Sequence, residues 1–175
     1  SISAEGKTFC SFNLATVFAY SGRKTVIIGA DMRRPRMFNE FGVANAKGLS
    51  NYLSYNADID EILQETDTDN LNIISGGPIP PNPSELLISE RMNQLLNALK
   101  ERFDYILLDT PPMGIVTDGF SLMQSADHVI YLVRQRYSRK EFIIDAQFMY
   151  ESGKISNISF LLNDVRPEKY GPGYG

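Results

Sequence analysis

The stretch that decides the fold opens the chain: Ser1-Ile2-Ser3-Ala4-Glu5-Gly6-Lys7-Thr8, directly ahead of a predicted helix. Its last three residues match the end of the pattern G-x-x-x-x-G-K-[ST]. In that pattern glycine lets backbone N–H groups surround phosphate oxygens, lysine reaches the β- and γ-phosphates, and the hydroxyl binds Mg²⁺. The N-terminus of the following helix adds its dipole to the same anion site. The first glycine of the pattern is Ser1 here, and such a triplet also occurs at ordinary helix starts, so the prediction depends on the rest of the chain.

Two acidic residues follow predicted buried strands. The apolar run over 105–108 ends in Asp109, and the run over 26–28 is followed by Gly29, Ala30 and Asp31. Because ligands bind beyond the carboxyl ends of parallel strands, Asp109 is predicted to hold Mg²⁺ directly or through water. Asp31 is predicted to reach the same metal or an attacking hydroxyl. Either residue alone is also common in a solvated turn, and the combination with the loop favours the functional interpretation.

The remaining chain alternates between strand-like and helix-like segments. Strands are predicted at 26–28, 71–74, 106–108, 129–133 and 158–162, and helices at 9–21, 58–64, 83–102 and 138–150. Residues 31–56 are expected to be irregular. Strands that alternate with helices imply a parallel sheet covered on both faces. We therefore predict an α/β fold, a P-loop NTPase-like three-layer sandwich with a mainly parallel central sheet. It spans residues 1–167, and residues 168–175 form a flexible tail that contains tyrosines.

Composition excludes several classes of protein. The 175 residues carry a net charge of −4 and a pI near 5.0, which argues against a nucleic-acid partner. One cysteine rules out an internal disulfide framework, and one histidine leaves no histidine cluster. No apolar run approaches the ~20 residues that span a bilayer. With no visible signal peptide, a reducing cytosolic compartment is the default expectation.

Taken together, these motifs resemble the bacterial protein-tyrosine kinases (BY-kinases) of capsular and exopolysaccharide synthesis, and the likeness runs over essentially the whole chain. The stretches that carry it are Gly6-Lys7-Thr8, Asp31-Met32-Arg33-Arg34-Pro35, Gly48-Leu49-Ser50, Pro80-Pro81-Asn82-Pro83-Ser84-Glu85-Leu86-Leu87 with Ser89-Glu90-Arg91, Asp109-Thr110-Pro111-Pro112, Val116-Thr117-Asp118 and Tyr170-Gly171-Pro172-Gly173-Tyr174-Gly175.

The resemblance implies an ATP- and Mg²⁺-dependent tyrosine autokinase that regulates polysaccharide polymerisation or export. It implies that neighbouring subunits of a ring-shaped homo-oligomer phosphorylate tail tyrosines of one another. It also implies a position on the cytoplasmic side of the bacterial inner membrane. There the kinase is part of, or bound to, a transmembrane polysaccharide co-polymerase that activates it.

The resemblance also assigns roles to individual residues. The expected catalytic residues are Lys7, Asp31 and Asp109. The expected magnesium ligands are Thr8, Asp31 and Asp109. The expected nucleotide-binding residues are Glu5, Gly6, Lys7, Thr8, Phe9 and Arg33. The expected phosphate acceptors are Tyr170 and Tyr174.

Three departures from the family pattern bear on these roles. Many members carry an Asp-x-Asp pair after the second strand, and position 29 is glycine here. Asp31 then serves alone as base or metal ligand, or no base is needed, or activity is reduced. The phosphate loop is also short of glycine. No strand precedes Ser1, although a phosphate loop needs one to anchor it, so we expect the sequence to be a fragment of a longer protein whose tail stops early.

Two other functions stay open. The partitioning and cell-division ATPases share the predicted fold, but they carry an additional lysine near the start of the loop, where residues 1–4 are Ser, Ile, Ser and Ala. They also lack a tyrosine tail. A nucleotide-binding regulator without catalysis, acting as an interaction module of an export complex, is the other alternative, and Gly29 is the feature that keeps it open.

Overall fold

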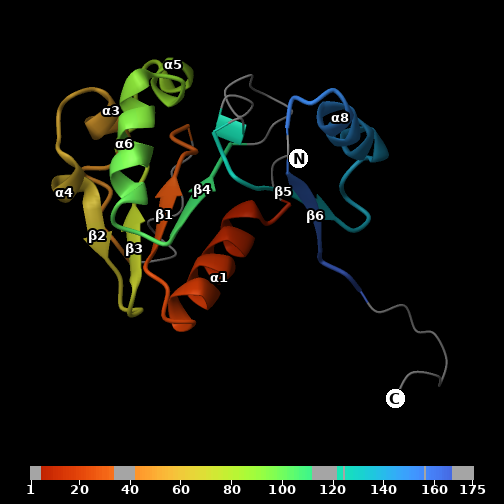
Figure 1. The fold of residues 1–175 in the computed structure, drawn as a ribbon, viewed down its shortest axis with the longest axis horizontal. Helices are drawn as coiled ribbons and strands as arrows, with labels where there is room; N and C mark the ends of the chain where they lie inside the picture. Colours follow the sequence, from red (N-terminus) through yellow and green to blue (C-terminus); the bar gives the residue numbers. More distant parts are fainter. Residues whose placement is uncertain (1–4, 34–41, 112–121, 124, 156, 167–175) are drawn as a thin grey trace. The chain divides into compact units, whose positions relative to one another are not determined.

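The computed structural model describes residues 5–33, 42–111, 122–123, 125–155 and 157–166. Contacts divide the chain into two compact units. One unit is Lys7–Leu122, and the other joins Ser1–Gly6 with Met123–Gly175. Their helices and strands are drawn in Figure 1.

A four-stranded sheet in the order β2-β3-β1-β4 forms the centre of the Lys7–Leu122 unit. β1 (Thr25–Gly29) pairs in parallel with β3 (Leu71–Ile74) on one side and with β4 (Tyr105–Asp109) on the other. β2 (Leu63–Glu65) pairs antiparallel with β3. The mainly parallel sheet agrees with the sequence prediction.

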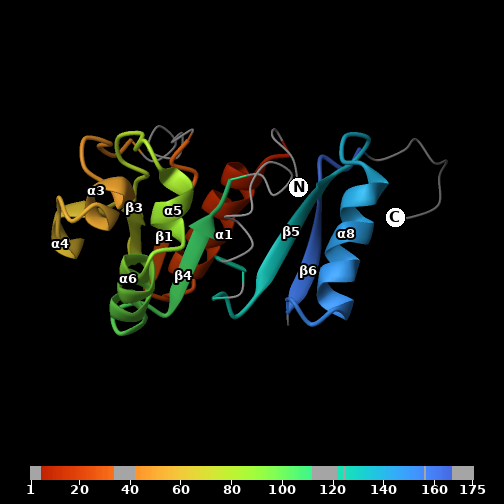
Figure 2. The same ribbon diagram turned by 90° about the horizontal axis from the view of Figure 1, so that it is seen from above.

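Both faces of this sheet are covered, as the unbroken apolar run of β1 predicts. Ile27 points to one face, where it packs with Ala15 and Ala19 of α1 (Lys7–Tyr20). Val26 and Ile28 point to the other face. Their cluster there includes Met92, Leu95 and Leu99 of α6 (Glu90–Lys100) and Leu87 of α5 (Pro83–Leu87). Figure 2 shows α1 on one side of β1 and β4 and the helices α5 and α6 on the other.

Three predicted segments differ from the structure. The helix predicted over 58–64 stops at the end of α4 (Ile59–Ile62), because the next three residues pair with β3 as β2. The helix predicted over 83–102 is two helices, α5 and α6, because the backbone of Ser89, the N-cap of α6, is extended (φ −73°, ψ 156°). The Ser89 hydroxyl donates to the carbonyl oxygen of Leu86 at 2.7 Å. The segment expected to be irregular over 31–56 contains α3 (Leu49–Leu53).

The second unit holds a two-stranded parallel sheet. β5 (Val129–Arg134) pairs with β6 (Ile158–Asn163) along its whole length, and α8 (Lys140–Glu151) connects them. These elements match the strands and helix predicted there within two residues. No helix among the described residues is long and apolar enough to cross a membrane. The predicted domain over 1–167 stays a prediction, and the tail over 168–175 lies outside the described residues.

Candidate nucleotide site

Thr8 and Asp109 meet at one point although 101 positions separate them in the chain. Thr8 lies in the first turn of α1, and Asp109 is the last residue of β4. The Thr8 hydroxyl donates a hydrogen bond of 2.7 Å to Oδ2 of Asp109. Asp109 is 5% exposed, so its carboxyl group is almost fully withdrawn from water. The two magnesium ligands predicted from opposite ends of this unit are therefore direct neighbours.

The surroundings of Asp109 disfavour the charged form of its carboxyl group. The pKa of this carboxyl is raised from 3.8 to about 6, mainly by burial and to a smaller degree by the negative charge of Asp31. Hydrogen bonds from Thr8 and Ser11 and the positive charge of Lys7 act in the opposite direction but do not cancel the effect of burial. Lys7, Thr8 and Asp31 thus all act on the Asp109 carboxyl group, which is what the proposed arrangement of the loop and the two acids requires.

Asp31 owes its place to the pairing of β1 with β4. Gly29, the last residue of β1, is the register partner of Asp109. The backbone N–H of Ala30 donates to the carbonyl oxygen of Asp109 at 2.9 Å. Asp31 follows one residue later and is half-buried. Asp109 therefore stands at the carboxyl end of β4 and Asp31 just beyond that of the adjacent parallel β1, the edge at which open α/β sheets bind ligands.

Arg33 contacts Ser84, a residue of the proline-rich stretch that carries part of the family resemblance. Its Nη2 donates to Oγ of Ser84 at 2.6 Å, which links the segment after β1 to the first turn of α5. Arg33 is exposed. Its role in nucleotide binding stays a prediction, and so does that of Phe9, whose side chain is 63% exposed on α1.

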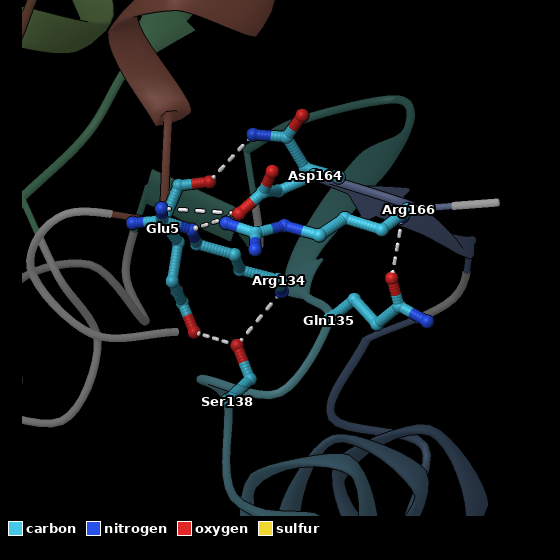
Figure 3. Close-up of polar contacts among 7 residues, drawn as sticks. Glu5, Arg134, Gln135, Ser138, Asp164 and Arg166 are labelled. Carbon is cyan, nitrogen blue, oxygen red and sulfur yellow. Dashed lines mark hydrogen bonds and ion pairs between the residues drawn. The ribbon is translucent and has the colours of Figure 1, made fainter. Parts of the chain in front are cut away.

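Glu5 and Gly6 belong to the second unit, where side chains of β6 and of the β5–α8 turn hold them (Figure 3). The Ser138 hydroxyl donates to Oε1 of Glu5, and Nδ2 of Asn163 donates to the Glu5 carbonyl oxygen at 2.9 Å. Gly6 has φ +91°, and a Cβ there would collide with the Asn163 amide. Glycine is therefore required at position 6 on two counts.

Some contacts could not be read from the sequence. The contact of Ser11 with Asp109 could have been predicted, because Ser11 lies one helical turn after Thr8 and so on the same face of α1. The contacts of Ser138 and Asn163 with Glu5 could not, because these residues are 133 and 158 positions away from Glu5 in the chain. Tyr170, Tyr174, residues 1–4 and the Val116-Thr117-Asp118 stretch lie outside the described residues.

The donor atoms at this site fit a magnesium–phosphate group. A hydroxyl and carboxylate oxygens are the hard ligands that Mg²⁺ takes, and a lysine ammonium complements phosphate charge. The buried carboxyl of Asp109 carries a raised pKa, which an added cation would reverse. In the part of the chain that the structure describes, no three His, Cys, Asp or Glu residues gather into a metal cluster, so a metal here would need the hydroxyl and a ligand's own oxygens.

Comparison with known proteins identifies the family to which the chain belongs. A family model described as an AAA domain matches residues 4–143. The tyrosine-protein kinase CpsD of Streptococcus agalactiae serotype III is 36% identical over 162 residues, covering 92% of this chain and 70% of CpsD. The structure of the kinase domain of Escherichia coli tyrosine kinase ETK superposes with a TM-score of 0.88 at 34% identity, covering 99% of this chain and 69% of that one.

A more distant structural neighbour shares the fold alone. The septum site-determining protein MinD of Pyrococcus horikoshii OT3, solved with Mg-ADP, has a TM-score of 0.78 at 20% identity, covering 97% of this chain and 69% of that one. The fold is thus that of an α/β domain of the P-loop NTPase type. Within that class the chain belongs to the bacterial tyrosine-protein kinases, and its enzyme class is protein-tyrosine kinase.

Proposed function

We propose that this chain transfers phosphate from ATP, with Mg²⁺, to the tail tyrosines Tyr170 and Tyr174 of a neighbouring copy. The observation that supports this most directly is the 2.7 Å bond between Thr8 and the buried Asp109, in a site that also feels the charges of Lys7 and Asp31. Phosphoryl transfer depends mainly on positioning and charge neutralisation, and these four residues supply the groups for both.

Each residue of the site has a separate task in this proposal. Lys7 binds the β- and γ-phosphates, and the backbone N–H groups of the loop hold their oxygens. Thr8, Asp31 and Asp109 hold the magnesium ion, which when bound neutralises charge on the phosphate oxygens. The hydrogen bond between Thr8 and Asp109 keeps both ligands in place before the nucleotide arrives, so little reorganisation is needed on binding.

Asp31 is the group that accepts the proton of the attacking tyrosine hydroxyl. It lies two residues beyond the end of β1, and the position of the other carboxylate of the family pair is Gly29. A half-buried carboxylate can take a proton from a hydroxyl that is placed within hydrogen-bonding distance. Because Asp31 is also a magnesium ligand in this proposal, the rate of transfer is lower than in a relative that divides these tasks between two acids.

The wider setting follows from the resemblance and is part of the proposal. The subunits form a ring in which the tail of one enters the site of the next. A glycine-rich tail suits this, because a flexible segment reaches a neighbouring site at low strain. The kinase acts at the cytoplasmic face of the inner membrane with a transmembrane co-polymerase, and its phosphorylation state regulates polysaccharide polymerisation or export.

The test uses the full-length protein with ATP and Mg²⁺, and mass spectrometry of the tail peptides. Phosphate on Tyr170 or Tyr174 in the wild type, and its loss in Lys7→Met, is the expected result. Mixing a Lys7→Met protein that keeps its tail with an active protein that carries Phe at positions 170 and 174 tests transfer between copies. Phosphate should then appear on the inactive partner.

A second candidate function is a nucleotide-binding regulator that transfers no phosphate. The observation that favours it is Gly29, which leaves the position beside Asp109 without a carboxylate. Tight binding of Mg-ATP without tail phosphorylation would support this alternative. ATP hydrolysis without phosphotyrosine would instead support an ATPase of the partitioning type.

A further inference from the structure

Glu5 is a buried acid inside a loop whose neighbours are proposed to bind phosphate. Its side chain is 1% exposed, although most loop acids face water. The Ser138 hydroxyl donates to Oε1 of Glu5, and the same Ser138 oxygen accepts the backbone N–H of Arg134 at 2.9 Å (Figure 3). One serine thus ties Glu5 to the turn that follows β5.

The main chain of the same loop is held separately. Nδ2 of Asn163, the last residue of β6, donates to the Glu5 carbonyl oxygen at 2.9 Å. The Asn163 amide also fills the space in which a side chain at Gly6 would lie. Glu5 and Gly6 are therefore clamped through the Glu5 carboxyl group by Ser138 and through the backbone by Asn163.

The turn that carries Ser138 is itself braced. Arg134 pairs with Asp164 at 3.1 Å, and the backbone N–H of Arg166 donates to the side chain of Gln135 at 2.7 Å. These contacts, drawn in Figure 3, join the end of β5 to the residues after β6. These contacts fix the backbone of the turn, so the Ser138 hydroxyl can hold Glu5 in one orientation.

Glu5 also acts on a second group of the same unit, the hydroxyl of Tyr131. The pKa of Tyr131 is raised to about 12, first by burial and then by the charges of Glu5 and Asp145. A buried carboxylate without hydrogen-bond donors is costly, since it loses its water and gains nothing in return. Loss of the Ser138 hydroxyl removes one hydrogen-bond donor from this buried side chain, which favours its movement toward water and loosens the peptide at Gly6.

We propose that Ser138 is a positioning residue of the phosphate-binding loop: its hydroxyl holds Glu5, and through Glu5 and Gly6 it sets the backbone that leads directly into Lys7. The inference rests on the proposed function, because it assumes that this loop binds the polyphosphate of ATP. Ser138 itself touches no phosphate in this scheme. It acts by reducing the number of loop conformations that the ligand must select among.

The experiment compares Ser138→Ala, Ser138→Thr and Ser159→Ala in the full-length protein. Ser159 is the matched control, an exposed serine of β6 whose hydroxyl bonds only to His128 among the contacts described. Binding of a fluorescent ATP analogue with Mg²⁺ is measured, together with displacement by tripolyphosphate and by adenosine. Ser138→Ala should weaken ATP and tripolyphosphate binding about tenfold, the size expected for one hydrogen bond to a charged group. Adenosine binding should not change, and Ser138→Thr, which keeps the hydroxyl, should bind ATP and tripolyphosphate with the affinity of the wild type.

A double-mutant cycle tests whether Ser138 works through Glu5. In a Glu5→Ala background, Ser138→Ala should weaken binding no further, because the partner is already gone. Equal tripolyphosphate affinity in the wild type and Ser138→Ala would overturn the inference, and so would additive effects in the cycle or an equal loss of adenosine binding. A wild-type protein that binds neither ATP nor tripolyphosphate would overturn the proposed function itself, and this inference with it.

Discussion

Gly29 stands directly beside Asp109 in the parallel register of β1 and β4. Both residues are buried, and Asp109 already has a raised pKa. Position 29 is where the Asp-x-Asp pattern expected from the resemblance would place its first acid. In this protein the neighbour of the buried carboxyl group is thus a residue without a side chain, and the site has one negative charge fewer than that pattern provides.

Replacing Gly29 by Asp should make the site dependent on a cation. Two adjacent buried carboxylates repel, so without metal the melting temperature at pH 8 should fall. Millimolar Mg²⁺ should recover much of that loss by mass action. Gly29→Asn is the control of similar size, and its melting temperature should not respond to Mg²⁺. An equal response of the two variants would contradict the account.

Asp109→Asn should stabilise the nucleotide-free protein, in a way that depends on pH. The folded-state pKa of about 6 lies above the unfolded value of 3.8, so the carboxyl's contribution is fully present below pH 3.8 and is lost as pH rises through 6. At pH 8 the wild type has lost about 3 kcal/mol, since two pKa units correspond to about that much. The variant avoids the loss. Urea unfolding at pH 4 and pH 8 measures it, with the exposed Asp67→Asn as control.

The same titration should govern magnesium-dependent nucleotide binding. A metal ligand must be deprotonated, so the affinity for Mg-ATP should fall as pH decreases through about 6, where Asp109 takes up its proton. Calorimetry at pH 5.5 and pH 7.5 would show proton release on binding at the lower pH. A profile that stays flat across this range would mean that Asp109 is not a ligand.

Thr8→Val removes a donor while keeping the shape of the side chain. The variant loses the 2.7 Å bond to Asp109 and the hydroxyl ligand together, so Mg-ATP affinity should drop about tenfold or more. Thr8→Ser keeps the hydroxyl and should bind close to the wild type. Binding in EDTA should be the same for all three proteins, because the lost interaction runs through the metal.

Leu99→Ala should destabilise the fold without touching the site. Leu99 is fully buried between α6 and the sheet, and truncating such a leucine costs about 2–5 kcal/mol. Ile88→Ala, at a side chain 57% exposed beyond α5, should change the free energy of unfolding by less than about 0.5 kcal/mol. Below the melting temperature of Leu99→Ala, both variants should bind nucleotide as the wild type does.

The meeting of Thr8 with Asp109 could be predicted from sequence, because strand ends of a parallel sheet share one edge whatever the details of packing. The β2 strand could not. Its three residues follow α4 without a break and become a strand only by pairing with β3, a contact that local preference does not encode. The break at Ser89 is also hidden, since the apolar spacing continues across a residue whose backbone is extended in the structure.

The orientation of the Glu5 side chain at the candidate site could not be predicted from the sequence either. Its position in the loop predicts contact with the ligand, yet its side chain is committed to Ser138, 133 positions away. Sequence spacing identifies residues that approach a ligand along the chain, but it carries no information on which of them are turned inward by a distant hydroxyl.

The antiparallel β2 also bears on how this protein behaves in a crowded solution. It is the outermost strand on the β3 side of its sheet and is only three residues long, ending in the exposed Glu65. A long bare strand at that position would offer a row of backbone groups to which another chain could add. A strand this short, closed by a charge, gives an incoming chain too few hydrogen bonds to hold, so this margin of the sheet is protected against aggregation.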